Sequence, residues 1–157
     1  MHAKIQMTKF ELAQLNIALM KEPFDSPVMV DFVANLERIN ALAENAPGFI
    51  WRLQTDDGDA TGLRPLGDDI LINISVWQDI AALSAYVYGA GHVEIMRRRK
   101  EWFDKMREAH LVLWWVLKGH RPTETEAIAR LEQLRAQGPT CDAFTLRDAF
   151  PQPQCEQ

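Results

Sequence analysis

The chain has 157 residues, of which 47% are hydrophobic and 25% are charged, the balance of an ordinary globular domain rather than a disordered or fibrous chain. Its net charge of −5 argues against a nucleic-acid-binding protein, because phosphate contacts rely on an excess of Lys and Arg across one face. No stretch approaches the roughly 20 apolar residues of a membrane span, and the N-terminus has no signal peptide, so we expect a cytoplasmic protein without a membrane partner.

The first half of the chain predicts a strand, a helix and two further strands. Residues 12–20 alternate in the manner of a strand, and a Ser26-Pro pair starts a helix that ends before Pro47. The apolar positions of this helix recur at helical spacing: Met29, Phe32, Leu36, Ile39 and Ala43. Residues 49–54 are aromatic and β-branched enough for a second strand, and residues 70–77 form a third strand after a polar loop.

The second half predicts two more helices on either side of a fourth strand. Asp79 caps a helix that the glycines at positions 89 and 91 bend or interrupt. The apolar positions of this helix are Ile80, Leu83, Val87, Val93, Met96 and Phe103. Residues 111–117 are almost wholly apolar, which is typical of a strand buried on both faces. Thr123 and Glu126 form a capping box for a third helix, and residues 144–147 are expected to add a short strand.

The order strand, helix, strand, strand, helix, strand predicts the α+β class. It is the ferredoxin-like β-α-β-β-α-β unit with an antiparallel sheet, here a single domain over residues 9–150 with an extra C-terminal helix and a flexible tail at 151–157. Both crossing helices of such a unit cover one face of the sheet. The other face must be covered by a partner subunit or by the C-terminal elements. We expect a homodimer through the sheet face that carries Asn73, Ser75 and Trp77.

Polar side chains and a tryptophan gather on one side of the first and third strands. Alternation places Gln14 and Asn16 together on the first strand, and Asn73, Ser75 and Trp77 together on the third. We expect all five on the helix-free face, lining a cavity for a planar, partly polar small molecule. The alternative is that these groups meet water or a dimer partner, since an antiparallel sheet often has one wet face.

His92 follows the glycine pair, where a break in the helix can aim its imidazole into a cavity as an acid, a base or an axial metal ligand. The alternative is a histidine hydrogen-bonded at a helix junction or simply solvated. The basic run from Arg97 to Lys100 spreads around a full helical turn, so at most one or two of its side chains can point toward the cavity. The cysteines and histidines show no zinc-site spacing, so no metal site is expected.

Several segments resemble a bacterial family of unknown function, and they are spread over most of the chain. They are residues 12–17, 46–52, 74–77, 92–103, 113–116 and 119–123. More distantly, the pattern is similar to the dimeric α+β barrel superfamily, which includes antibiotic-biosynthesis monooxygenases, haem-degrading monooxygenases and small stress-responsive barrels. The resemblance implies a dimeric α+β barrel here.

Two branches of that superfamily imply roles for individual residues. The resemblance to the haem-degrading members places Asn16, Tyr86 and His92 around the ligand, with Tyr86 at the position where those members have a tryptophan. The resemblance to the quinone-forming members implies that Asn73, Trp77 and one arginine of the run 97–99, which we assign to Arg97, orient a phenolic substrate.

These observations lead us to expect a small cofactor-independent monooxygenase-like enzyme that acts on an aromatic or polycyclic molecule between the sheet and the second helix. The expected catalytic residues are His92, Asn16 and Tyr86, and the expected substrate-binding residues are Gln14, Asn73, Ser75, Trp77 and Arg97. No cofactor is expected. Two alternatives stay open: a haem-binding or haem-degrading protein with His92 on the iron, and a non-enzymatic dimeric ligand-binding module.

Overall fold

The structure, a computed structural model, describes residues 9–55 and 61–153. Its elements follow in the order β1 (Phe10–Met20), η1 (Pro27–Met29), α1 (Val30–Glu44), β2 (Phe49–Arg52), β3 (Ile70–Trp77), α2 (Ile80–Val87), α3 (Ala90–Met96), α4 (Arg99–Trp102), β4 (Phe103–Asp104), β5 (Leu111–Leu117) and α5 (Glu124–Gln137). Within these two ranges, no helix has both the length and the apolar character needed to cross a membrane.

All strand pairs are antiparallel, and β1 lies at the centre of the sheet. β3 pairs with one edge of β1 and carries β2 on its far side, while β5 and the short β4 pair with successive parts of the other edge. The order β2-β3-β1-β5, with helices between β1 and β2 and between β3 and β5, is the ferredoxin-like arrangement. The predicted α+β class and β-α-β-β-α-β order are therefore confirmed.

Local sequence signals set several element boundaries. The Asp79 carboxylate accepts a hydrogen bond from the Ala82 N–H at 2.8 Å and caps α2, as predicted. Gly89 has extended backbone, with φ −72° and ψ 153°, which separates α2 from α3 and confirms the predicted interruption. Gly119 and Gly138 have φ values of 92° and 76°, a left-handed region that favours glycine, and they follow the ends of β5 and α5.

The predicted helix start is confirmed, because Ser26 is the N-cap of the 3₁₀ turn η1 and Pro27 is its first residue, although the Ser26 side chain makes no capping bond. Three other local predictions were wrong in detail. β2 ends at Arg52, two residues earlier than expected. Phe103 lies in β4 rather than in a helix, because the chain straightens there to pair with the end of β1. The last segment forms no strand, and only an isolated bridge joins Phe144 to Leu113.

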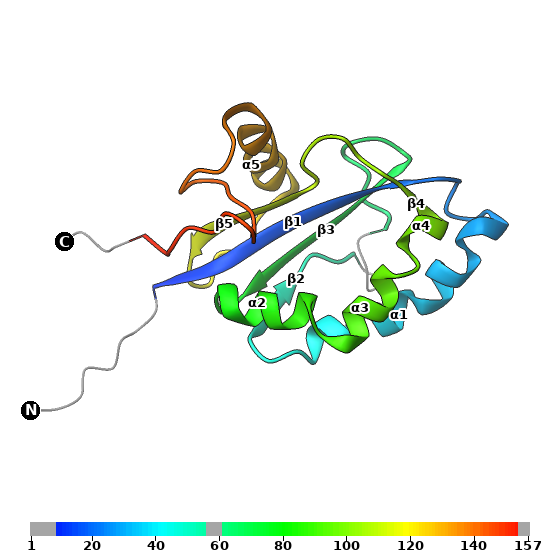
Figure 1. Cartoon of the computed structure of the whole chain (residues 1–157), viewed down its shortest axis with the longest axis horizontal. Helices are drawn as coiled ribbons and strands as arrows, with labels where there is room; N and C mark the ends of the chain where they lie inside the picture. Colours follow the sequence, from blue (N-terminus) through cyan, green and yellow to red (C-terminus); the bar gives the residue numbers. More distant parts are fainter. Residues whose placement is uncertain (1–8, 56–60, 154–157) are drawn as a thin grey trace, which may run out of the picture.

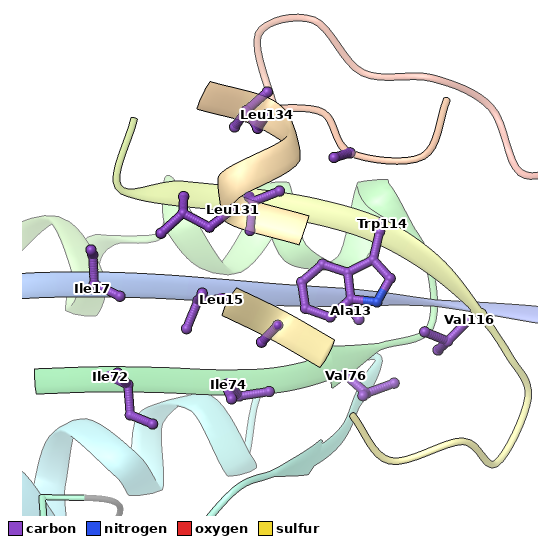
Figure 2. Packing of buried hydrophobic residues seen from close by; sticks show 13 residues of the cluster. Ala13, Leu15, Ile17, Ile72, Ile74, Val76, Trp114, Val116, Leu131 and Leu134 are labelled. Carbon is purple, nitrogen blue, oxygen red and sulfur yellow. The ribbon is translucent and has the colours of Figure 1, made fainter. Parts of the chain in front are cut away.

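Helices cover both faces of the sheet. α1, α2, α3 and α4 lie on one side, and α5 lies on the opposite side (Figure 1). The face toward α5 carries the main hydrophobic core, in which the following strand residues are buried: Ala13, Leu15, Ile17, Ile72, Ile74, Val76, Val112, Trp114 and Val116. Figure 2 shows Leu131 and Leu134 of α5 directed toward this face. α5 thus covers the apolar face within the chain.

The prediction of a helix-free polar face was wrong. Asn73, Ser75 and Trp77 do share one face with Gln14 and Asn16, but this is the face that α1, α2 and α3 cover. Alternation determines which residues share a face of a strand, and it leaves open which face the helices cross. The dimer was predicted because one face of the sheet was expected to be uncovered. In the described residues, α5 covers the opposite face, so both faces are covered and this reason no longer applies. The homodimer itself stays a prediction.

Glu126 ties α5 to the sheet in a way that a capping box does not predict. Thr123 Oγ1 accepts a hydrogen bond from the Glu126 N–H at 3.1 Å, which is the first half of the box. The Glu126 carboxylate, however, accepts from Trp114 Nε1 at 2.9 Å and pairs with His120 Nε2 at 2.6 Å. Burial alone raises the pKa of Glu126, but the hydrogen bonds from His120 and Trp114 outweigh it and hold the pKa below its usual 4.5.

We expect Glu126→Gln to lower the free energy of unfolding by about 1 kcal/mol at pH 7 and by less at acidic pH. A carboxylate whose pKa is lowered by folding stabilises the protein above its unfolded pKa, and this contribution is lost as the pH falls through the folded pKa. Urea titrations of both proteins between pH 7 and pH 3 measure the difference. Glu132→Gln, on the exposed side of α5, is the control and should change little at either pH. A pH-independent effect of Glu126→Gln would contradict the role given to the carboxylate.

Candidate functional site

A cavity of about 330 Å³ lies between the sheet and the helices α1, α2 and α3. β1 and β3 form its floor, α2, α3 and α4 form one wall, and α1 forms its roof. Ligand pockets in proteins measure roughly 300–1,000 Å³, so this cavity is at the small end of the range. It suits a molecule of one or two aromatic rings better than a large polycyclic one.

The roof helix α1 stands over the cavity instead of packing on the sheet. Its inward residues recur at helical spacing and line the cavity: Phe32, Leu36, Ile39, Asn40 and Ala43. None of the 15 residues of α1 is buried, and part of its inner face borders the cavity. In the sequence, the apolar side chains of this helix suggest packing in a hydrophobic core. In the structure they instead face a cavity large enough for a small ligand.

Gln14 organises the polar floor. Its Nε2 donates to Asn73 Oδ1 at 2.7 Å and to Ser75 Oγ at 2.8 Å. Trp77 Nε1 donates to the same Ser75 oxygen at 2.8 Å, and Asn16 Nδ2 donates to Gln14 Oε1 at 3.4 Å. The amide of Gln14 and the indole N–H of Trp77 are thus engaged within the protein. These two residues position the floor, while other groups remain for a ligand.

Asn73 is the clearest free donor on the floor. Because its Oδ1 accepts from Gln14, its Nδ2 carries the N–H groups that are left, and they have no partner among the described residues. The Asn73 side chain is exposed, and it lines the cavity. Asn16 has a second amide N–H beyond its long bond to Gln14. The floor therefore presents N–H donors, which suit a carbonyl or phenolate oxygen.

Trp77, Tyr86 and His92 form an aromatic wall. The rings of Trp77 and Tyr86 are stacked, with centroids 5.0 Å apart and planes at 30°. The rings of Tyr86 and His92 also have centroids 5.0 Å apart. Burial raises the pKa of Tyr86 to about 12, so its phenol stays protonated at neutral pH. Tyr86 can stack and can donate a hydrogen bond, but it cannot serve as a base there.

His92 offers the nitrogen that can accept a proton. Its Nδ1 lies 3.0 Å from the Val87 carbonyl oxygen, and because a carbonyl only accepts, Nδ1 carries the proton of the neutral ring. Nε2 then has a free lone pair, with no partner among the described residues. Burial lowers the pKa of His92 below 6.5, although the hydrogen bond to Val87 opposes this. The imidazole is therefore neutral at pH 7.

All of the predicted site residues except Arg97 line this one cavity: Gln14, Asn16, Asn73, Ser75, Trp77, Tyr86 and His92. Arg97 is exposed and does not line the cavity, whereas Arg99 does. Arg97 and Arg98 lie in the turn between α3 and α4, and Arg99 begins α4. Helical spacing from His92 does not extend across this turn, so it could not have identified Arg99 in the sequence.

Arg52 is a cavity residue that the sequence did not identify. The pairing register places Arg52 opposite Ser75, on the cavity side of β2, while Trp51 packs against the main core. Arg52 Nε donates to Glu44 Oε2 at 2.7 Å. β2 has only four residues, too few for an alternation signal, so the inward face could be assigned only from the register.

No metal-binding cluster accompanies the cavity. In residues 9–55 and 61–153, no group of three or more His, Cys, Asp or Glu side chains is arranged to hold a metal ion.

Residues 11–157 match the family described as Domain of unknown function (DUF3291). The chain belongs to this family. The match spans β1 through α5 and so includes every element that forms the cavity. No curated protein matches the chain.

Solved structures of similar arrangement come from several bacteria. SnoaB from Streptomyces nogalater, a cofactor-independent oxygenase, is 19% identical with a TM-score of 0.44, over 74% of this chain and 98% of that one. A Pseudomonas aeruginosa protein is 11% identical with a TM-score of 0.48, over 73% and 99% of the two chains. A candidate antibiotic biosynthesis monooxygenase from Chloroflexus aurantiacus is 12% identical with a TM-score of 0.44, over 72% and 97%. At these levels of similarity, nothing about activity follows from them.

Proposed function

We propose that this protein is a cofactor-independent monooxygenase-like enzyme that oxidises a small phenolic molecule in the cavity between sheet and helices. The observation that carries the proposal is the neutral His92 ring, whose Nε2 is free beside a stacked aromatic wall. A base at this position can remove the hydroxyl proton of a phenol whose ring is held against Tyr86 and Trp77. The donor-rich floor supports the same chemistry, because it stabilises the oxygen anion that forms.

In this mechanism the protein supplies a base, an anion-binding floor and a fixed orientation. The phenol lies against the wall with its oxygen on the N–H donors of Asn16 and Asn73. His92 Nε2 removes the phenolic proton, and the amide donors stabilise the phenolate. Gln14 holds the Asn73 amide in the orientation that turns donors toward the ligand. The roof helix α1 excludes water from the electron-rich ring.

The substrate and dioxygen supply the redox chemistry. The phenolate gives its electrons to dioxygen, and a C–O bond forms at the ring carbon opposite the phenolate oxygen. Cleavage of the O–O bond and loss of the ring proton from that carbon give a quinone and one water. One atom of dioxygen becomes the second quinone oxygen, the other leaves as water with the phenolic and ring protons, and the substrate supplies all four electrons.

A panel of one- and two-ring phenols tests this proposal by oxygen uptake. We expect at least one of them to consume one dioxygen per quinone formed, faster than in buffer alone. Under ¹⁸O₂, the quinone should gain one labelled oxygen atom. Uptake equal to that of buffer with every phenol that binds the protein would favour the non-enzymatic binding module, and hydrogen peroxide formed without labelled product would contradict monooxygenation.

Haem fits the cavity poorly. His92 Nε2 is chemically suited to be an axial ligand. A volume of about 330 Å³ is small for a macrocycle, and the Tyr86 ring lies only 5.0 Å from the imidazole ring. We therefore derive no step through haem. A hemin titration checks this directly, since a Soret band that depends on His92 would restore the haem alternative.

A further inference from the structure

The charged lining of the cavity is cationic, although the whole chain has a net charge of −5. Arg52 and Arg99 line the cavity, and no Asp or Glu does so among the described residues. Arg52 is neutralised by Glu44, with 2.7 Å between Nε and Oε2. Arg99 is the cation that remains.

Arg99 has no counter-ion in the part of the chain that the structure describes. Its neighbour Arg98 pairs with both Asp31 and Glu101, at 2.7 and 2.8 Å. Arg97 is exposed to solvent on another side of the same segment. Of these three consecutive arginines, one is paired within the protein, one is solvated, and one lines a cavity without a partner. Such an arrangement suits a ligand anion, because an unpaired charge in a partly enclosed site is unfavourable.

A second unpartnered donor lies one helical turn beyond Arg99. Trp102 lines the cavity and is only 1% exposed, and its Nε1 has no acceptor among the described residues. The Trp102 ring packs on Phe32, with centroids 5.3 Å apart. A buried N–H without an acceptor is costly. Around Arg99 and Trp102 the cavity lining therefore combines apolar side chains with a guanidinium and an indole N–H that have no partner among the described residues.

From these observations we infer that the cavity binds an apolar small molecule that carries one anionic group, such as a carboxylate, and that Arg99 binds this group. The inference rests on the proposed function, because it names the substrate class of the same cavity. His92 lies near the start of α3 and Arg99 at the start of α4, and both line the cavity. The substrate is thus an aromatic acid whose phenol lies near His92 and whose acidic group lies near Arg99.

Two fluorescent probes of similar shape test the inference without any turnover. 1-Anilinonaphthalene-8-sulfonate carries a sulfonate, and N-phenyl-1-naphthylamine is its uncharged counterpart. We expect Arg99→Gln to raise the dissociation constant of the sulfonate probe about tenfold, the effect of losing one charge-assisted hydrogen bond. The dissociation constant of the neutral probe should change less than about twofold, since it makes no bond to the guanidinium.

Arg97→Gln is the matched control, because it removes the same charge two positions away and off the cavity. It should leave both probes unaffected. Ala43→Phe, which fills the cavity from α1, should weaken both probes and so show that they bind there. Equal effects of Arg97→Gln and Arg99→Gln, or no effect of Arg99→Gln on the sulfonate probe, would overturn the inference. If Arg99 governs anion binding but no phenolic acid supports oxygen uptake, the proposed function fails and the anion site stands.

Discussion

Replacing His92 with glutamine is expected to lower the rate of phenol oxidation by about 10²–10⁴-fold, the usual contribution of general acid–base catalysis. Glutamine has a similar length and keeps a donor for the Val87 carbonyl, but it has no nitrogen that accepts a proton. The melting temperature and the affinity for the substrate should therefore change little. Initial rates of oxygen uptake, thermal melts and binding titrations measure the three quantities on the same samples.

The pH profile gives a second readout of the same prediction. Burial lowers the pKa of His92 below 6.5, and catalysis needs the neutral ring, so kcat/KM should be constant near pH 7 and fall as the pH drops through the His92 pKa. The free energy of unfolding should also fall as the pH drops. Folding lowers the pKa of His92, so the neutral ring stabilises the folded protein above the unfolded pKa, and this contribution is lost at lower pH. The acidic limb of the rate should vanish in His92→Gln.

His120→Gln is the control for this experiment, since His120 lies outside the cavity and pairs with Glu126 on the other side of the sheet. It should leave the rate and its pH profile unchanged. Two results would count against His92 as the base: an acidic limb that persists in His92→Gln, or a rate loss that only follows a loss of folded protein.

The strands could be predicted closely where burial imposed a pattern. β3 occupies residues 70–77 as expected, because one side chain in two had to be apolar for the main core. β5 occupies residues 111–117, where an apolar run meets α5 on one face and the C-terminal segment on the other. β4 carried no such signal, since its two residues pair only with the end of β1.

The assignment of faces could not be predicted from one strand at a time. Polar residues such as Gln14 and Ser75 suggested a wet face, but their polar atoms are bonded to each other beneath the helices. The apolar face is instead covered by α5, which follows the β-α-β-β-α-β unit in the sequence. Only the packing of complete elements shows which face each helix covers.

The candidate site was predictable where residues share one element, and it was missed where elements meet. Asn73 and Trp77 lie on one strand, and His92 follows a glycine break that the sequence displays. The pairing of Gln14 with Asn73 and Ser75 depends on the register between β1 and β3, which alternation alone does not give. Arg52 depends on the register of β2 in the same way. The lining of the cavity depends on these strand registers, so it could not be predicted in full from single elements.

Trp114 and Trp115 are neighbours in β5, yet their side chains lie on opposite faces of the sheet, as alternation predicts. Trp114 is fully buried against the α5 face, and its Nε1 donates to Glu126 at 2.9 Å. Trp115 is only partly buried on the other face, where its Nε1 donates to the Phe150 carbonyl at 3.0 Å. The pair is a matched test of burial in the same residue type on the same strand.

Trp114→Ala should lower the free energy of unfolding by about 3–5 kcal/mol, because it leaves a large cavity beneath α5 and strips the Glu126 carboxylate of its indole donor. Trp115→Ala should cost less, about 1–3 kcal/mol, since part of that ring already meets solvent. Urea unfolding of both variants gives the comparison. If Trp114→Ala does not fold, the milder pair Trp114→Phe and Trp115→Phe should show the same order. Equal small losses at both positions would mean that α5 does not pack on β5 as described, because only that packing makes the two neighbouring tryptophans unequal.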